Sequence, residues 1–162
     1  MRVLLAFILC ILSLGAFANM NANTKTVVFV HGSWGGGWDY KNMQTLLEKQ
    51  GYKVYRPTMT GLGERAHLNT PKVNLDTHIK DIVNLFKYEE LQDVILVGHS
   101  YGGMVISGVA ELIPEKIKHL LYVDALVPEN GESGFSMMPP ERAEYFKQLA
   151  KDNKNQTWAI PP

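Results

Sequence analysis

The chain has 162 residues, of which 46% are hydrophobic and 20% are charged, and its 16 basic residues balance its 16 acidic ones. Length and composition are ordinary for one globular domain, which excludes a disordered chain and a fibrous repeat. The zero net charge, without any basic run, argues against nucleic-acid binding, and no cluster of metal ligands is visible. The function must therefore be sought in the motifs of a small globular protein.

The first 18 residues predict a cleavable signal peptide. Arg2 supplies a positive start, residues 3–14 form an apolar stretch, and Ala16-Phe17-Ala18 is a small-residue cleavage pattern. The stretch is shorter than the ~20 residues of a spanning helix, so a membrane anchor is disfavoured, and a buried first strand is the other alternative. We expect cleavage after Ala18, export to a periplasm or out of the cell, and no membrane contact afterwards.

The rest of the chain alternates predicted strands with predicted helices. Strands are predicted over 26–30, 52–56, 94–97 and 117–123, from short runs of apolar and often β-branched residues. Helices are predicted over 38–50, 75–86 and 101–112. The run 94–97 has no polar alternation, which is typical of a strand covered on both faces. This α/β order predicts right-handed βαβ units, and hence a parallel sheet of four strands with helices on both faces.

The sequence Gly98-His99-Ser100-Tyr101-Gly102 stands directly between a buried strand and a helix. In this context it predicts a nucleophile elbow, a sharp turn that projects the Ser100 hydroxyl from the carboxyl end of the sheet. Small residues at Gly98 and Gly102 let the turn close, and the helix that follows points its first amides toward developing negative charge. The alternative is a tight turn that carries an inert serine.

A glycine-rich segment, His31–Trp38, follows the first strand. Its glycines let backbone N–H groups approach a substrate oxygen closely, and a tetrahedral oxyanion needs two such donors. We expect the amides of Ser33 and Tyr101 to be these donors. A phosphate-binding loop would need a Gly-Lys-Ser/Thr ending, which is absent, so a flexible connection is the main alternative.

These segments resemble the α/β-hydrolase family, in the branch of plant methylesterases, hydroxynitrile lyases and small bacterial esterases. The matching segments are His31–Trp38, Pro57–Arg65, Val97–Gly103 and Tyr122–Pro128, in the family's order and at similar spacing. The resemblance implies a small carboxylic ester as substrate, Ser100 as nucleophile, the amides of Ser33 and Tyr101 as oxyanion hole, and neither cofactor nor metal. It also implies that residues 19–162 are a hydrolase domain whose residues 139–162 begin the cap over the active site.

The family's triad order is Ser, then Asp or Glu, then His. Because the sequence stops at Pro162, we expect the last strands, the triad acid and the triad His to be missing, and the hydrolase to be impaired. Asp124 is expected to be structural, since an acid without an imidazole cannot complete general-base catalysis. A structural or surface role is expected for each of the five histidines, which are His31, His67, His78, His99 and His119.

Three functions stay open at this point. The first is a serine hydrolase of small carboxylic esters. The second is a carbon–carbon lyase of the hydroxynitrile type on the same fold. The third is an inactive fragment or a small-ligand-binding protein that uses the region of Trp34, Trp38 and Trp158. In each case the unpaired flank of the fourth strand would favour self-association.

Overall fold

The computed structural model describes residues 25–153 and contains one sheet of four parallel strands in the order β2-β1-β3-β4. The strands are β1 (Thr26–Val30), β2 (Lys53–Tyr55), β3 (Val94–Ser100) and β4 (Ile117–Ala125). The two strands with the most continuous apolar runs, β1 and β3, lie in the centre, where both faces are covered. The predicted four-stranded parallel sheet is confirmed.

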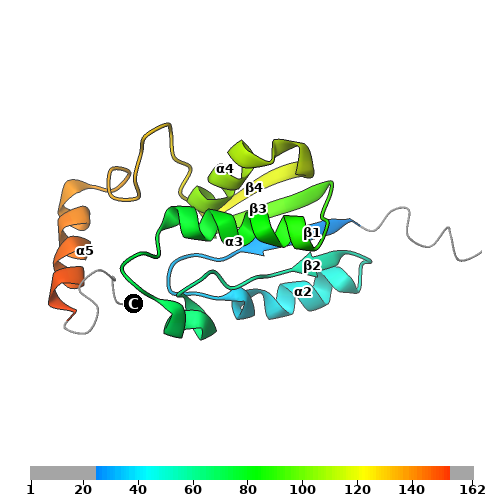
Figure 1. Cartoon of the computed structure of the whole chain (residues 1–162), viewed down its shortest axis with the longest axis horizontal. Coiled ribbons are helices and arrows are strands. Elements are labelled where there is room, and N and C mark those ends of the chain that lie inside the picture. Colours follow the sequence, from blue (N-terminus) through cyan, green and yellow to red (C-terminus); the bar gives the residue numbers. More distant parts are fainter. Residues whose placement is uncertain (1–24, 154–162) are drawn as a thin grey trace, which may run out of the picture.

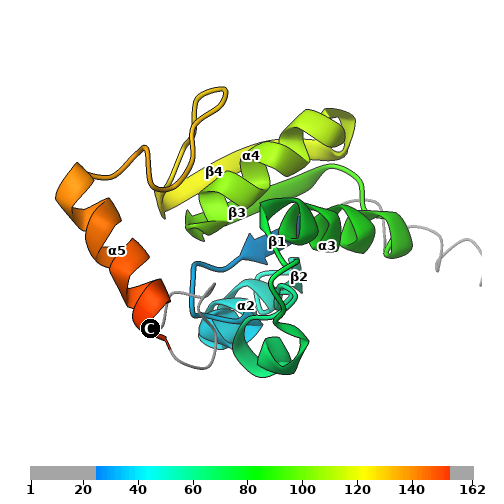
Figure 2. The same cartoon turned by 60° about the vertical axis from the view of Figure 1, so that its left-hand side comes forward.

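Helices cover both faces of this sheet, also as predicted. The helices are α2 (Lys41–Glu48), α3 (Leu75–Tyr88), α4 (Gly102–Leu112) and α5 (Pro140–Asp152), with short 3-10 helices η1 (Gly37–Tyr40), η2 (Gly63–Leu68) and η3 (Pro114–Lys116). Figure 1 shows α3 and α4 on one face and α2 on the other. Helix α5 lies apart, beyond the carboxyl ends of the strands (Figure 2).

The hydrophobic core is divided between the two faces by the twofold alternation of the strands. On the face of α3 and α4, the buried cluster includes Val28, Val30, Leu96, Ile82, Phe86, Val105, Ile106 and Val109. On the face of α2, a smaller cluster contains Val27, Phe29, Val54 and Val97. Each such aliphatic or aromatic side chain contributes about 1.5–3 kcal/mol when fully buried, so the α3–α4 face supplies most of the stabilisation.

Several boundaries differ from the prediction, each for a reason outside the local pattern. The helix expected over 38–50 is divided at Tyr40, whose backbone is not helical (φ −100°, ψ 13°) and whose ring stacks on Phe29 with centroids 4.7 Å apart. Strand β3 continues to Ser100 because Ser100 pairs with Ala125, and the Leu126 N–H donates to the Ser100 carbonyl oxygen at 3.0 Å. Tertiary pairing therefore lengthens both β3 and β4.

Some predictions fall outside the described residues. These are the signal peptide at 1–18 with its cleavage after Ala18, and the part of the expected cap beyond residue 153, including Trp158. Of the helices within 25–153, none combines the length and apolar character that a membrane crossing requires.

Candidate active site

A sharp turn between β3 and α4 carries Ser100 at the carboxyl end of the sheet. Its backbone is left-handed, with φ +53°, a conformation that costs a non-glycine residue about 1–2 kcal/mol. A Cβ on Gly98 would stand 2.7 Å from the Gly102 carbonyl oxygen, and one on Gly102 would stand 2.4 Å from the Val30 carbonyl oxygen. Only glycine fits at either position, so the turn has the strain and the close packing of a nucleophile elbow.

The glycine-rich segment 31–38 lies directly against this serine. A Cβ on Gly32 would stand 2.9 Å from the Ser100 Cβ and 3.4 Å from its Oγ. Ser33 follows and is exposed, and within residues 25–153 no hydrogen bond occupies its amide. Trp34 is left-handed (φ +63°), and its ring contacts Phe146 of α5 with centroids 6.3 Å apart. The segment thus borders Ser100 on one side and α5 on the other.

Buried hydrogen bonds hold the glycine-rich segment against the loop that follows β2. The His31 imidazole is fully buried, and its Nδ1–H donates to the Gly32 carbonyl oxygen at 2.8 Å while its Nε2 accepts the Met59 N–H at 3.1 Å. The Gly37 N–H donates to Thr58 Oγ1 at 2.8 Å. Burial lowers the pKa of His31, which keeps Nε2 free to accept. The backbone next to Ser33 is therefore fixed before any substrate arrives.

Tyr101, the residue after Ser100, is held by a second hydrogen-bond network, which is partly buried. Its hydroxyl donates to His78 Nδ1 at 2.8 Å, and His78 Nε2–H donates to the Thr60 carbonyl oxygen at 2.9 Å. The Asp81 carboxylate accepts both the Thr60 N–H at 2.6 Å and the Thr60 hydroxyl at 2.9 Å. Burial lowers the pKa of His78 and raises the pKa of Tyr101, so both groups are neutral near pH 7.

Sequence reasoning gave His78 no part near Ser100, although one signal was present. His78 lies three residues after Leu75 and four before Ile82, on the apolar stripe of its helix. A histidine on a buried stripe must find polar partners, because an unsatisfied buried polar group is costly. Which partners it finds depends on how α3 packs against the turn at Tyr101, and no local pattern encodes that packing.

Two of the five histidines are excluded as a proton acceptor for Ser100 by their own contacts. Both ring nitrogens of His31 and of His78 are occupied by hydrogen bonds. His67 and His119 are exposed, as expected for surface residues. His99 Nδ1 lies 3.4 Å from the point where a Cβ on Gly32 would stand, so His99 borders the same segment as Ser100. Within residues 25–153, no hydrogen bond joins an imidazole to the Ser100 hydroxyl.

Asp124, the next-to-last residue of β4, lies beside Ser100 and is the extra residue of a β-bulge. His99 pairs with Val123 and Ser100 pairs with Ala125, so Asp124 has no partner position on β3. Its backbone is left-handed, with φ +43°, and its side chain is exposed. Asp124 therefore lies at the same sheet edge as Ser100 without a buried structural contact.

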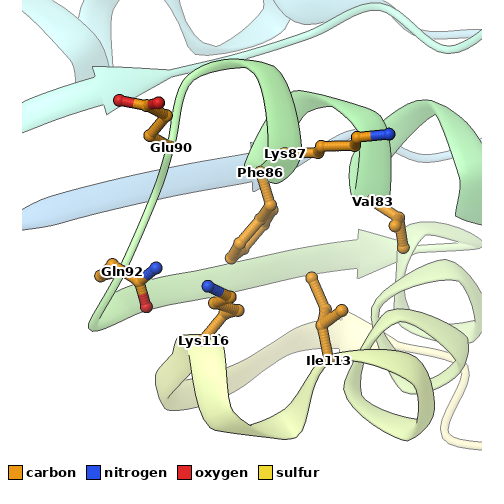
Figure 3. A pocket seen from close by; sticks show the side chains of 7 residues that line it. All are labelled: Val83, Phe86, Lys87, Glu90, Gln92, Ile113 and Lys116. Carbon is orange, nitrogen blue, oxygen red and sulfur yellow. The ribbon is translucent and has the colours of Figure 1, made fainter.

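A cavity of about 540 Å³ lies at the opposite end of the sheet, between the end of α3 and η3 (Figure 3). Phe86 and Ile113 form its apolar walls, whereas Lys87 and Glu90 point away from the space between them. The cavity lies away from the carboxyl ends of the strands, where open α/β sheets bind their ligands, so it is a weaker candidate than the Ser100 turn. In the described part of the chain, no three His, Cys, Asp or Glu side chains are grouped to hold a metal ion.

Comparison with known proteins agrees with this geometry. A carbendazim-hydrolysing esterase of Nocardioides sp. (strain SG-4G) is 54% identical over 112 residues, which are 69% of this chain and 46% of that protein. Putative methylesterase 15 of Arabidopsis thaliana is 30% identical over 148 residues, which are 86% of this chain and 33% of that protein. The solved structure of an extracellular alpha/beta-hydrolase from a Paenibacillus species superposes with a TM-score of 0.76 at 34% identity, over 81% of this chain and 53% of that one.

The chain spans from a third to about half of the length of these relatives. Residues 27–162 match the alpha/beta hydrolase family as a whole. The parallel sheet, the helices on both of its faces and the glycine-bounded turn at Ser100 are the features of that fold. The chain belongs to the alpha/beta hydrolase family.

Proposed function

We propose that the protein is a serine hydrolase of small carboxylic esters, with Ser100 as its nucleophile. The observation that carries this proposal is the left-handed backbone of Ser100 at the start of α4, in contact with the glycine-rich segment. Strain of this kind persists where the surrounding structure imposes it, and functional sites are where it clusters. The carbendazim-hydrolysing esterase and the putative methylesterase among the relatives support an ester as the substrate.

In the proposed reaction, the Ser100 oxygen attacks the acyl carbon, and the carbonyl oxygen becomes an oxyanion that the amides of Ser33 and Tyr101 bind. The alcohol leaves with a proton, and water then attacks the acyl-enzyme to release the acid. The five histidines of this sequence all lie within residues 25–153 and none of them is bonded to Ser100, so the proposed proton acceptor is an imidazole that this sequence does not contain. Without that imidazole, only a residual rate of roughly 10³–10⁴ over water is expected, by analogy with subtilisin variants that lack a triad residue.

The decisive experiment treats the natively expressed protein with a fluorophosphonate and then measures its intact mass. One adduct on Ser100, which Ser100→Ala abolishes, is the expected result. A protein that takes no adduct and hydrolyses no ester would be an inactive ligand-binding relative. A reaction with an activated ester that is quenched before turnover is complete separates hydrolase from lyase. A hydrolase then carries an acyl group on Ser100, whereas a carbon–carbon lyase of the hydroxynitrile type accumulates no acyl-enzyme.

Export is part of the proposal. Residues 1–18 have the charged start, apolar stretch and cleavage pattern of a signal peptide, and the Paenibacillus relative is described as extracellular. The protein would then act in a periplasm or outside the cell. The mass of the protein recovered from the producing cells tests this, since the exported form should begin at Asn19.

We also propose that residues 139–162 begin a cap over the site, and that β4 mediates self-association. The contact between Trp34 and Phe146 supports the first, because it joins α5 to the segment that borders Ser100. The exposure of Leu121 and Val123, 48% and 52%, supports the second, since β4 is an edge strand of the described sheet. If a second copy of the chain binds at this edge, the sedimentation coefficient should rise with protein concentration. Leu121→Lys should abolish that dependence on concentration.

A further inference from the structure

Tyr101 is attached to the fold at a point far from its own backbone. Its phenol hydroxyl is bonded to the imidazole of His78 on α3, and their rings also meet edge to face with centroids 5.7 Å apart. The other imidazole nitrogen is bonded to Thr60 in the loop after β2. The His78 imidazole therefore joins three parts of the fold, namely the start of α4, the helix α3 and the loop at Thr60.

The backbone at Ser100 and Tyr101 needs such an attachment. Ser100 has φ +53°, and Tyr101 has φ −54° as the N-cap of α4, without a side-chain hydrogen bond to the helix end. A strained turn relaxes unless the surrounding structure holds both of its sides. On one side, Gly102 packs against β1, and on the other, the anchored tyrosine ring fixes the direction of the residue that follows Ser100.

We propose that His78 is a positioning residue for the oxyanion hole, holding the Tyr101 amide in place through the Tyr101 hydroxyl. This inference rests on the proposed function, in which that amide binds the oxyanion. Its effect falls on the transition state, because an oxyanion exists only after the nucleophile has attacked.

The polar character of the network argues against a role for His78 that is limited to filling space in the hydrophobic core. An apolar side chain on the same stripe of α3 would fill the space without the cost of burying an imidazole. Here the Tyr101 hydroxyl, both His78 nitrogens and both Asp81 oxygens have partners. Thr60, whose carbonyl oxygen accepts from His78, is itself held by Asp81 through its N–H and its hydroxyl. A fully satisfied network of this kind specifies one arrangement of its members.

Two replacements of His78 separate its two hydrogen bonds. The amide of asparagine can mimic Nδ1, and the amide of glutamine can mimic Nε2, because of their different distances from the Cα. His78→Asn therefore retains the bond to Tyr101, whereas His78→Gln retains only the bond to Thr60. Tyr101→Phe removes the hydroxyl and leaves the ring. Ile82→Val is the matched control, since it shortens a fully buried side chain on the same helix without a polar change.

We expect kcat for an activated ester to fall about tenfold in His78→Gln and Tyr101→Phe with KM unchanged, part of the loss that follows complete removal of an oxyanion donor. His78→Asn should restore most of the rate, and the double variant His78→Gln/Tyr101→Phe should be no slower than either single one, because one interaction is lost in all three. Ile82→Val should lower the melting temperature and leave kcat as it is. Rates that follow melting temperature across the four single variants, or a His78→Asn no better than His78→Gln, would overturn the proposal.

Hydrogen exchange of the Met104 amide, which donates to the Tyr101 carbonyl oxygen at 3.0 Å, gives a readout that needs no activity. It should be about tenfold faster in His78→Gln, and unchanged in His78→Asn and Ile82→Val, since only the first frees the turn. A wild-type protein that takes no fluorophosphonate adduct would end the proposed function, while the exchange data would still decide the positioning role. Equal exchange of the Met104 amide in wild type and His78→Gln would overturn that role.

Discussion

Strain at Ser100 links a single backbone angle to the chemistry proposed for its side chain. Ser100→Gly removes both the hydroxyl and the penalty of φ +53°, whereas Ser100→Ala removes the hydroxyl alone. We expect Ser100→Gly to be the more stable of the two by roughly 0.5–1 kcal/mol, the strain relieved less the extra freedom of glycine in the unfolded chain. Urea unfolding of both variants measures this difference. A glycine variant less stable than the alanine variant would show that the turn is not strained.

The glycines around the turn act by leaving space for backbone atoms. A methyl group on Gly102 would stand 2.4 Å from the Val30 carbonyl oxygen, which belongs to the central strand and cannot move alone. Gly102→Ala should therefore cost about 2–3 kcal/mol of unfolding free energy and abolish adduct formation at Ser100. Gly134→Ala is the control, because its nearest atoms are ordinary contacts at 3.6 Å and beyond, and it should change stability by less than about 0.5 kcal/mol. Equal losses in the two variants would contradict this account.

The sequence allows some of these residues to be predicted and not others. Ser100, Gly98 and Gly102 are readable because a nucleophile elbow is built from neighbours in the chain, so five consecutive residues carry its geometry. His78 is not readable in the same way, since its partners lie 18 and 23 residues away in the chain. The contact of Trp34 with Phe146 could not be predicted either, because it depends on where α5 lies.

Among the elements, helix α3 contributes two members of the hydrogen-bond network behind Tyr101, namely His78 and Asp81. It begins with a capping box in which the Asn74 side chain accepts the Thr77 N–H at 3.1 Å and the Thr77 hydroxyl oxygen accepts the Asn74 N–H at 3.3 Å. Thr77 directly precedes His78, so the cap orders the turn of helix from which the network starts.

Removal of this cap gives a prediction for the whole helix. Asn74→Ala should lower the unfolding free energy by about 1 kcal/mol, the usual cost of losing an N-cap side chain. Asn84→Ala, on the exposed side of the same helix, is the control, and it should be neutral or slightly stabilising because alanine is the better helix former. Thermal unfolding of the two variants would show the difference. Equal melting temperatures would mean that the Asn74 side chain does not stabilise the helix.

Element types could be predicted more closely than element ends. The stripe at Leu75, Ile79, Ile82, Val83 and Phe86 marks α3 unambiguously, because these residues repeat with the period of a helix. The ends of β3 and β4 depend on each other, through the pairing of Ser100 with Ala125 across the bulge. The division of the helix expected over 38–50 likewise depends on the ring of Phe29, a residue of another element.

On the scale of the whole molecule, two buried neutral histidines tie stability to pH. Burial lowers the pKa of His31 and of His78 below the ordinary value of 6.5, and both use a ring nitrogen as an acceptor. Between pH 6.5 and these lowered values, the unfolded chain binds protons that the folded protein does not. Stability is therefore complete above pH 6.5 and falls as the pH drops below it, by at most about 1.4 kcal/mol per pH unit for each histidine.

The two carboxylates whose pKa the fold lowers cannot produce this loss in the same window. Hydrogen bonds lower the pKa of Glu64 and Glu144 from 4.5, so any stability that they add is lost only at more acidic pH. Urea midpoints measured between about pH 8 and about pH 5 should thus be level at first and then decline through the histidine window. In His78→Gln the decline should have about half the slope, because His31 then remains as one of the two histidines whose pKa burial lowers. A level profile down to pH 5, or a slope that His78→Gln leaves unchanged, would show that these imidazoles are not held neutral by the fold.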